Sequence, residues 1–547
     1  MRLRVQMPVF FALAAASAWA QLQPTIAPRS MVNAASLTPA SIPGGSIAQG
    51  SIFSIFGTNL GPANPLTQTN FPLDTQLGGI VVRVIQGTTT LNAIPIYASA
   101  TRIDAIMPSN APLGMVSVQA ANGVVRGNMA PVRVTDASFG IYTINQIGFG
   151  PGQVMNLNDD GSAAGQNTAA SPAVQGQTIQ LIGSGLGANG DFPPVTVEVF
   201  VGGEASTVVS SGRSGDVGGQ DQITFQIPDD ALLGCYVPVM VRLNGTVPSN
   251  TATIAISSDG SACADAVNPF SNAIITGGKL AFAVALRSSV REDVGTLTPT
   301  DVVSDNAAIY LRSESGGSLA FNPVFSLPPP GSCITQSGAG DWFTRSAIPG
   351  TEPSAGYLKG PANFSVTGQG SGKSAPLAAT GLGMAKVGSR ISIFAKVPST
   401  IFLGPGNTVI SAGATPTVGG ISTTISMPPV PNWSNRDQIT NIDRTMDLTV
   451  NFDGIADGQT VLIVGGAVDV PTYSTALFAC VAPPGATSFT VPAPVLAAIP
   501  ASRRLPIQTK GVLYVGTASV PTTFTATNID FGIGIGLALN GKTVVFK

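Results

Sequence analysis

An internal repeat in the first half of the chain constrains its fold more than any other feature. The block GSIFSIFGTNLG at 50–61 returns as GQTIQLIGSGLG at 176–187. Three further matches follow in the same order: 82–87 with 197–202, 102–114 with 222–234, and the dipeptide Asn122-Gly123 with Asn244-Gly245. Each copy has roughly 120 residues, enough to bury a core of its own, so we expect two copies of one domain in tandem.

The repeated blocks alternate apolar and polar residues with the period of a β-strand. Ile223, Phe225 and Ile227 point to one side of such a strand, while Thr224 and Gln226 point to the other. Short strands separated by turns, for which the chain has 64 glycines and 43 prolines, are typical of antiparallel sandwiches. We therefore predict an all-β protein with tandem immunoglobulin-like β-sandwiches over 27–140 and 141–257.

The second half of the chain also shows strand patterns. Blocks such as 279–286 and 460–464 are separated by proline-rich breaks. We predict one or two further β-rich domains in this half. If there are two, they are a β-rich domain over 270–430 and a β-rich C-terminal domain over 431–547. Short helical turns are expected only at 495–499 and 442–445.

The first twenty residues have the layout of a secretory signal peptide. Arg2 and Arg4 give a positive start, 9–16 is a short apolar run, and Ala18-Trp19-Ala20 is a cleavage motif of the A-x-A kind. No later apolar run reaches the roughly 20 residues that a membrane-spanning helix needs. We therefore expect 1–20 to be removed and the mature chain to be exported, to the extracellular space or the cell surface.

Four cysteines remain in the mature chain, and an even number in an exported protein indicates disulfides. Their spacing contains no C-x-x-C pair, which argues against a zinc or redox site. Three pairings are possible. We favour Cys235–Cys263 and Cys333–Cys480, because each bridge then stays within one half of the chain. The second bridge would cross the expected boundary near residue 430 and would favour a single C-terminal domain.

Composition excludes several classes of function. The chain has no histidine, which excludes Ser-His-Asp and Cys-His catalysis and histidine-ligated metal sites. Its formal net charge of −2 gives no field that would attract nucleic acid. GSGKS at 370–374 lacks the first glycine of a P-loop, and GGSIA at 44–48 and GGSLA at 316–320 end in alanine where a nucleophile elbow has glycine. We expect plain loops there, and no cofactor.

One acidic segment resembles a metal site. NLNDDGS at 156–162 has the alternating oxygen ligands of a calcium loop, but Asn167 stands where such a loop has a bidentate glutamate. Its Asp-Gly pair is typical of a tight hairpin turn, which is the favoured interpretation.

Pairs of carboxylates are the remaining candidates for catalysis. Adjacent acids point to opposite faces of a strand or lie in turns, and such pairs are Asp159/Asp160, Asp229/Asp230 and Glu292/Asp293. Distant acids that the fold could bring together, Asp341 with Asp447 or Asp453, stay open as glycosidase carboxylates.

Two tryptophans are candidate platforms for a ligand. Trp342 lies in Asp341-Trp-Phe, and Trp433 lies in a loop bounded by prolines. Aromatic rings with an exposed face suit sugar binding, so each could serve as a platform. The alternative is a tryptophan that plugs the end of a sandwich.

Several motifs in the first half resemble those of a known family. VNAAS at 32–36, GSIFSIFGTNLGP at 50–62, LNDDGS at 157–162 and IGSGLG at 182–187 look like the uncharacterised Solibacter C-terminal domain family. This family is similar to tandem IPT/TIG-type immunoglobulin-like sandwiches of secreted bacterial proteins, and the resemblance covers about 27–257. It implies fold and export and supplies no catalytic residue. The family's domain usually closes its chain, whereas here the chain continues to residue 547. Two later segments, 435–454 and 478–501, resemble another C-terminal module of such proteins, also without a known function.

Together these features favour a secreted or cell-surface modular protein without catalytic activity, structural or adhesive, or binding a polysaccharide or a protein surface. We expect no nucleic-acid partner and no metal. The alternative is a polysaccharide-degrading enzyme with two carboxylates in 270–547 and the N-terminal sandwiches as accessories. A cleft with two buried acids of perturbed pKa in that half would favour the enzyme.

Overall fold

The structure is a computed structural model of the chain. It describes residues 22–188, 195–265, 268–292, 300–322, 325–339, 356–358, 364–368, 374–379, 384–390, 403–472, 474–502 and 511–547. The predicted signal peptide at 1–20 lies outside these residues. Among the helices in the described ranges, none is long and apolar enough to span a bilayer.

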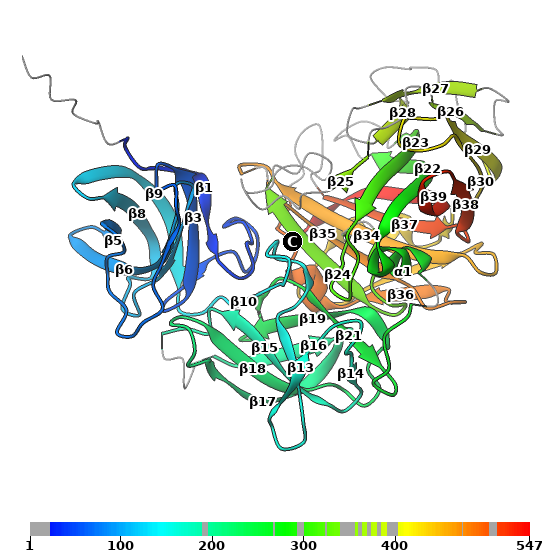
Figure 1. The fold of residues 1–547 in the computed structure, drawn as a ribbon. Helices are drawn as coiled ribbons and strands as arrows, with labels where there is room; N and C mark the ends of the chain where they lie inside the picture. The colour runs from blue at the N-terminus through cyan, green and yellow to red at the C-terminus, as the bar shows by residue number, and fades with distance from the viewer. Residues whose placement is uncertain are drawn as a thin grey trace, which may run out of the picture.

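Residues 25–135 form a two-sheet sandwich, called sandwich 1. Its strands are β1 Thr25–Asn33, β2 Ile47–Ala48, β3 Ile52–Thr58, β4 Leu66–Thr67, β5 Ile80–Gln86, β6 Thr89–Ala98, β7 Arg102–Ile106, β8 Gly114–Asn122 and β9 Val125–Thr135 (Figure 1). One sheet has the order β1-β3-β7-β6 and the other β6-β5-β8-β9, with β2 added parallel to β9. Strand β6 belongs to both sheets, because it pairs with β5 in its first half and with β7 in its second. The order is the ABED and CFG arrangement of immunoglobulin domains.

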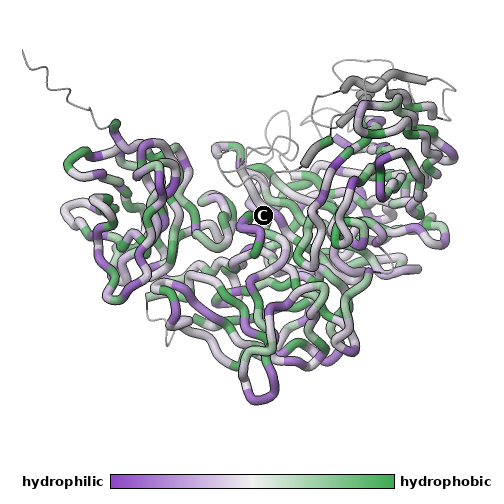
Figure 2. Tube along the Cα trace, viewed as in Figure 1, coloured by the Kyte–Doolittle hydropathy of each residue, from purple (hydrophilic) through white to green (hydrophobic). Residues whose placement is uncertain are grey.

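Alternate residues of these strands fill the core of sandwich 1. Ile55 lies opposite Ile103 in one sheet, and Val84 lies opposite Val118 in the other. All four are fully buried in one cluster. Hydrophobic and hydrophilic residues therefore alternate along the chain, as Figure 2 shows.

Residues 140–257 form sandwich 2, which has the same topology. Its strands are β10 Gly140–Ile141, β11 Gly150–Pro151, β12 Val154–Leu157, β13 Ala163–Gln166, β14 Ala173–Val174, β15 Thr178–Ser184, β16 Val197–Val201, β17 Glu204–Arg213, β18 Asp221–Gln226, β19 Gly234–Leu243, β20 Val247–Pro248 and β21 Ala252–Ser257. One sheet has the order β12-β15-β18-β17 and the other β17-β16-β19-β21.

The sequence repeat maps onto equivalent strands of the two sandwiches. The matched blocks fall on β3 and β15, on β5 and β16, and on β7 and β18. Asn244 and Gly245 both have positive φ, 50° and 67°, as the central residues of a type I′ hairpin require. The prediction of an all-β protein with tandem immunoglobulin-like sandwiches is confirmed.

The C-terminal half, residues 268–547, is built around one large sheet. Its elements are α1 Pro269–Thr276, β22 Gly278–Glu292, β23 Thr300–Glu314, β24 Cys333–Ala339, β25 Gly356–Tyr357, β26 Phe364–Thr367, β27 Ser374–Ala379, β28 Met384–Arg390, β29 Gly406–Ala412, β30 Ile421–Met427, β31 Asn432–Trp433, the 3-10 helix η1 Arg436–Gln438, β32 Asn441–Ile442, β33 Leu448–Asp453, β34 Thr460–Asp469, β35 Ser474–Val481, β36 Ser488–Val491, α2 Ala493–Ala497, β37 Gly511–Ala518, β38 Thr522–Ala526 and β39 Ile529–Phe546. The sheet has the order β24-β35-β34-β37-β39-β22-β23-β28-β27-β26-β29-β30, while β31, β33 and β36 form a small separate sheet.

The C-terminal half gives two kinds of information on the boundary expected near residue 430. Most buried side chains pack with others on their own side of this boundary, because one core cluster consists mainly of residues from 281–427 and another mainly of residues from 433–546. The backbone crosses it, because β22 pairs in parallel with β39 over twelve residue pairs. The division into domains therefore stays a prediction.

Two helical expectations need correction. The eight-residue helix α1 was not expected, although Asn268 caps its N-terminus by accepting a hydrogen bond from the Phe270 N–H and Pro269 occupies its first turn. The expected helical turn at 442–445 is instead the end of β32 followed by a turn, and a short 3-10 helix lies just before it. The helical turn expected at 495–499 is present as α2.

Both favoured disulfides are present. Cys333 and Cys480 lie directly opposite each other on β24 and β35. Cys235, at the start of β19, is joined to Cys263 in the segment that leads from sandwich 2 to α1.

The VNAAS motif forms the junction between the two sandwiches. Asn33 is fully buried, and its Oδ1 accepts hydrogen bonds from the backbone N–H groups of Ala35 and Ser36. Its Nδ2 donates to the carbonyl oxygens of Ser138 and Ser184 in the second repeat, at 3.2 and 2.9 Å. Figure 1 shows sandwich 1 and the C-terminal half side by side above sandwich 2.

Candidate ligand-binding cavity in the C-terminal half

A cavity of about 310 Å³ lies on one face of the large sheet. Four of its floor residues are in register on adjacent strands: Leu286 on β22 pairs with Leu537 on β39, Leu537 with Ala518 on β37, and Ala518 with Thr460 on β34. Neighbouring residues in such a row point to the same face of a sheet. The row therefore forms a continuous floor across four strands.

Side chains alternate along each strand, so that large side chains point to the cavity face of the large sheet and small ones to the opposite face. On β22, Ala283 and Ala285 pack into the core cluster on the far side, whereas Val284 and Leu286 line the cavity. On β39, a side chain at Gly536 would meet Met427 at 3.0 Å, while its neighbours face the cavity. Small residues bring β30 close to one face, and large aliphatic residues cover the other.

A group of stacked aromatic rings forms one end of the cavity. Phe270 of α1 and Phe282 of β22 both stack on Phe325, with ring centroids 5.1 and 4.2 Å apart. Tyr310 of β23 meets Phe325 edge-on at 6.2 Å. Packed rings of this kind are held in place by their neighbours, so this wall is fixed without a ligand.

Prolines form much of the rim. Pro328 and Pro330 lie on one side, and Pro484 and Pro521 line other parts. The proline ring fixes φ and offers no N–H group. The rim is therefore both stiff and poor in hydrogen-bond donors.

Three of the polar side chains around the cavity form hydrogen bonds to backbone groups of the protein. Asn268 accepts from the Phe270 N–H and donates to the Phe325 carbonyl oxygen at 2.9 Å. The Ser519 hydroxyl accepts from the Gly536 N–H, and Gln459 Oε1 accepts from the Ala456 N–H. These groups shape the walls and leave an apolar interior.

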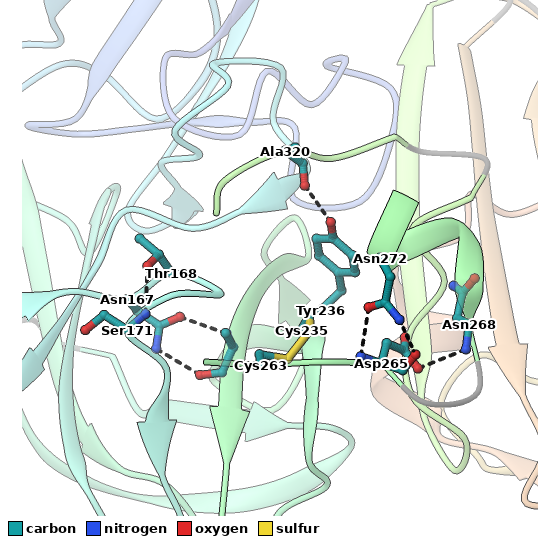
Figure 3. Close-up of a disulfide and its surroundings, with 11 residues drawn as sticks. Asn167, Thr168, Ser171, Cys235, Tyr236, Cys263, Asp265, Asn268, Asn272 and Ala320 are labelled. Atoms are coloured by element: carbon teal, nitrogen blue, oxygen red, sulfur yellow. Dashed lines mark hydrogen bonds between the residues drawn. A yellow bond between two sulfur atoms is a disulfide. The ribbon is translucent and has the colours of Figure 1, made fainter. Parts of the chain in front are cut away.

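Sandwich 2 anchors the segments that make two of the walls (Figure 3). The Cys235–Cys263 disulfide lies two residues before Asp265, whose backbone and side chain bond to Asn272 and to Asn268. Tyr236, next to that disulfide, donates to the carbonyl oxygen of Ala320 at 2.5 Å. Burial raises the pKa of Tyr236 to about 12, so its hydroxyl stays a donor.

The tryptophan candidates do not line this cavity. Trp433 is 3% exposed, lies opposite Phe452 in the small sheet, and donates its indole N–H to Asn435 Oδ1 at 3.0 Å. It is a core residue with no exposed ring face, which corrects its assignment as a platform. The prolines around Trp433 indicate a loop, but the residue lies in β31, which turns the ring inward. Trp342 lies outside the described residues.

The segment at 156–162 is a hairpin turn between β12 and β13. The Asn158 N–H donates to the Ser162 carbonyl oxygen, and Asp160 Oδ1 accepts from the backbone and hydroxyl of Ser162. These bonds lower the pKa of Asp160. Within the described ranges, no group of three or more acidic or cysteine side chains could hold a metal ion.

The remaining motifs are dispersed. Of GSGKS, only Ser374 is described, at the start of β27, while 44–48 ends in β2 and 316–320 follows β23. Asp229 and Asp230 are exposed in a turn, as are Asp159 and Asp160.

The described members of the distant pairs, Asp447 and Asp453, each accept a hydrogen bond from a different segment of the chain. Asp447 accepts from the Ala493 N–H and Asp453 from the Asn432 side chain, while Asp341 and Asp293 lie outside the described residues.

One buried acid in the C-terminal half has a perturbed pKa. Burial raises the pKa of Asp305, which lies 3.8 Å from Arg287 and accepts from the Leu403 N–H. Among the described residues that line the cavity, Asp265 is the single acid. A glycosidase needs two, so this cavity does not supply the pair that the enzyme alternative requires.

No known protein family and no curated protein matches the chain. Among solved structures it is similar to the Plexin A4 full extracellular region, with 12% identity over 44% of this chain and 19% of that chain and a TM-score of 0.16. It is also similar to the Bacteroides ovatus mixed-linkage glucan utilization locus protein SGBP-B in complex with a mixed-linkage heptasaccharide (10% identity, 78% and 79% coverage, TM-score 0.14). A third is the immunoglobulin domains of Sidekick-1 (10% identity, 90% and 100% coverage, TM-score 0.11). With TM-scores this low, the assignment of fold rests on the strand topology described above.

Proposed function

We propose that the mature chain is an exported, non-catalytic binding protein in which two immunoglobulin-like sandwiches carry a C-terminal half that holds an apolar ligand. The observation that carries the proposal is the cavity of about 310 Å³ on the large sheet. Its size falls at the lower end of ligand pockets, and like them it is mostly apolar with a few polar groups at its edge.

The cavity is preformed, which favours binding over a purely structural role. Stacked phenylalanines, a proline rim and hydrogen-bonded Asn268 fix the walls in the free protein. A ligand entering such a site pays little to order it. Filling the space with atoms also recovers contacts that the lining now lacks.

A neutral fluorescent probe tests the proposal. N-Phenyl-1-naphthylamine is expected to bind the mature chain with a rise in fluorescence. The substitution Leu537→Trp fills the cavity from its floor and is expected to weaken probe binding by about tenfold or more. The matched control is Thr424→Trp, on an exposed position of β30. No probe binding, or equal binding by the two variants, would overturn the proposal.

Export and family membership belong to the same proposal. The signal-like segment at 1–20 and the two disulfides support export to the extracellular space or cell surface. Membership of the uncharacterised Solibacter C-terminal domain family is supported by the VNAAS motif. Secretion is checked by N-terminal sequencing of the exported chain, which is expected to begin at Gln21.

A polysaccharide or protein surface as partner also stays a prediction. A glycan-binding screen on the full mature chain, with reducing-end release measured in parallel, separates the alternatives. Binding without release is the expected result. Release of reducing ends would establish the enzyme and would direct attention to acids away from the cavity.

A further inference from the structure

We infer that the cavity takes a single unbranched, uncharged alkyl chain, such as that of a fatty alcohol. The inference rests on the proposed function, because it names the ligand class of the same cavity. It follows from the shape of the floor, the chemistry of the lining and the charge beside it.

The floor is long in the direction that crosses the strands. Its register row, Leu286 to Leu537 to Ala518 to Thr460, crosses four strands. With neighbouring strands about 4.8 Å apart, the row is about 14 Å long. The aromatic group at Phe325 borders the cavity along β22, next to Phe282, and Val481 of β35 lies opposite Leu462 beyond the β34 end of the row. A linear chain can contact the whole row, whereas a compact ligand of equal volume would contact part of it.

The volume sets the size of the ligand. A cavity of about 150 Å³ binds benzene, which has six non-hydrogen atoms. The 310 Å³ found here therefore accommodates roughly a dozen such atoms. This corresponds to one alkyl chain of medium length and is too small for several sugar rings.

The lining offers little to a polar ligand. Asn268, Ser519 and Gln459 Oε1 already bond to backbone groups of the protein. Few other polar side chains line the cavity, so a sugar would replace only part of the bonds to water that it loses there, which is costly. An alkyl chain has no such bonds to lose.

The negative charge of Asp265 at the cavity disfavours ligands with a carboxylate head group. Asp265 is the one ionisable carboxylate among the described lining residues, and no lysine or arginine accompanies it there. A fatty carboxylate would have to be desolvated next to a like charge. A neutral head group avoids that repulsion, so alcohols should bind and carboxylates should not.

Competition for the fluorescent probe on the full mature chain tests the inference. The competitors are 1-decanol, decanoate and 1-adamantanol, the last having the carbon and oxygen count of 1-decanol in a compact shape. We expect 1-decanol to displace the probe at least about tenfold more effectively than either of the others. Affinity should also rise about fourfold for each methylene added between 1-octanol and 1-decanol.

The outcomes separate the inference from the proposed function. Equal or stronger displacement by 1-adamantanol or decanoate would overturn the alkyl-chain inference while leaving a ligand site in place. Probe binding that is absent, or unaffected by Leu537→Trp, would overturn the proposed function itself. The variant Asp265→Asn sharpens the charge argument, because it should improve the binding of decanoate relative to that of 1-decanol; an unchanged ratio of the two affinities would contradict the argument.

Discussion

In the two N-terminal sandwiches and in the C-terminal half, side chains alternate between the two faces of each strand, but the faces are covered differently in the two regions. In sandwich 2, Phe225 and its inward neighbours pack between two sheets of one domain, and their side chains are fully buried. In the C-terminal half one sheet must serve clusters on both of its faces. Alanines and glycines allow close packing on one face, while the other is covered by a short helix and proline-rich segments. That incomplete cover leaves the cavity.

The comparison teaches where binding capacity can arise in an all-β chain. In a closed sandwich the apolar side chains are buried between the two sheets. The surface that remains available for binding therefore lies in the loops and at the strand edges. A sheet covered by irregular segments keeps large side chains that are only half buried, such as Leu286 and Leu537. These residues contribute less to stability and are free to contact a ligand.

The largest expected effect is the loss of stability on removal of a disulfide, and it should differ between the two bridges. Cys333–Cys480 closes a span of 147 residues inside the C-terminal half, whereas Cys235–Cys263 closes 28. Loop-closure entropy predicts a loss of about 5 kcal/mol in the free energy of unfolding when the first pair is replaced by alanine, and about 3.5 kcal/mol for the second. Guanidinium unfolding of the two double variants measures this order. Equal losses would show that the long span keeps structure when unfolded.

Truncation in the two regions should differ sharply. Phe225→Ala in sandwich 2 is expected to cost about 4 kcal/mol, because it opens a cavity in a closed core. Leu537→Ala should cost about 1 kcal/mol, because this residue is half buried and already borders empty space. Both values come from denaturant unfolding followed by fluorescence. A loss of several kcal/mol for Leu537→Ala would mean that the floor is a core and would weaken the binding proposal.

A third prediction concerns the buried ion pair of sandwich 2. Asp221 lies 2.7 Å from Arg213 and accepts from the N–H groups of Gly185 and Leu186. Burial nevertheless raises the pKa of Asp221 to about 6 from 3.8. The folded state therefore holds this proton more tightly than the unfolded state does. Its contribution to stability is present below about pH 4 and is lost as the pH rises to about 6.

The direction of this change in stability with pH can be measured by comparing the wild type with the variant Asp221→Asn. Between pH 4 and pH 7, the free energy of unfolding of the wild type should fall by about 2–3 kcal/mol relative to this variant. Taking the difference removes the opposite contributions of exposed acids such as Asp160 and Asp443, whose pKa values are lowered by hydrogen bonds. A difference that stays constant with pH would show that Arg213 keeps the carboxylate ionised throughout.

The fold was predictable where the sequence repeats or alternates over short distances. The blocks on β3 and β15 and the Asn244-Gly245 turn carry their own local signals. The cysteine pairing was predictable for another reason, because each bridge stays within one half of the chain. Helix α1 was missed because its eight residues are too few to show a helical period, although the Asn268-Pro269 start was readable.

The cavity could not have been predicted. Its floor joins Leu286 to Leu537, and only the parallel pairing of β22 with β39 brings them together. Register between strands so far apart in sequence has no local signal. The same limit applied to Trp433, because its neighbours Asn432 and Ser434 are polar and the residue that turns it inward, Phe452, lies on another strand.

The smallest expected effect tests whether the sandwiches are rigidly joined. Asn33→Asp keeps an oxygen to accept from Ala35 and Ser36, but it removes the two donors to Ser138 and Ser184 in the second repeat. A carboxylate would then face two carbonyl oxygens, so we expect a loss of about 2 kcal/mol and faster proteolysis between the sandwiches. Asn33→Ala removes the local bonds as well and should cost somewhat more. If Asn33→Asp behaved like the wild type, the side chain would serve only the local turn, and the two sandwiches would have to be treated as independent domains in the comparison with the C-terminal half.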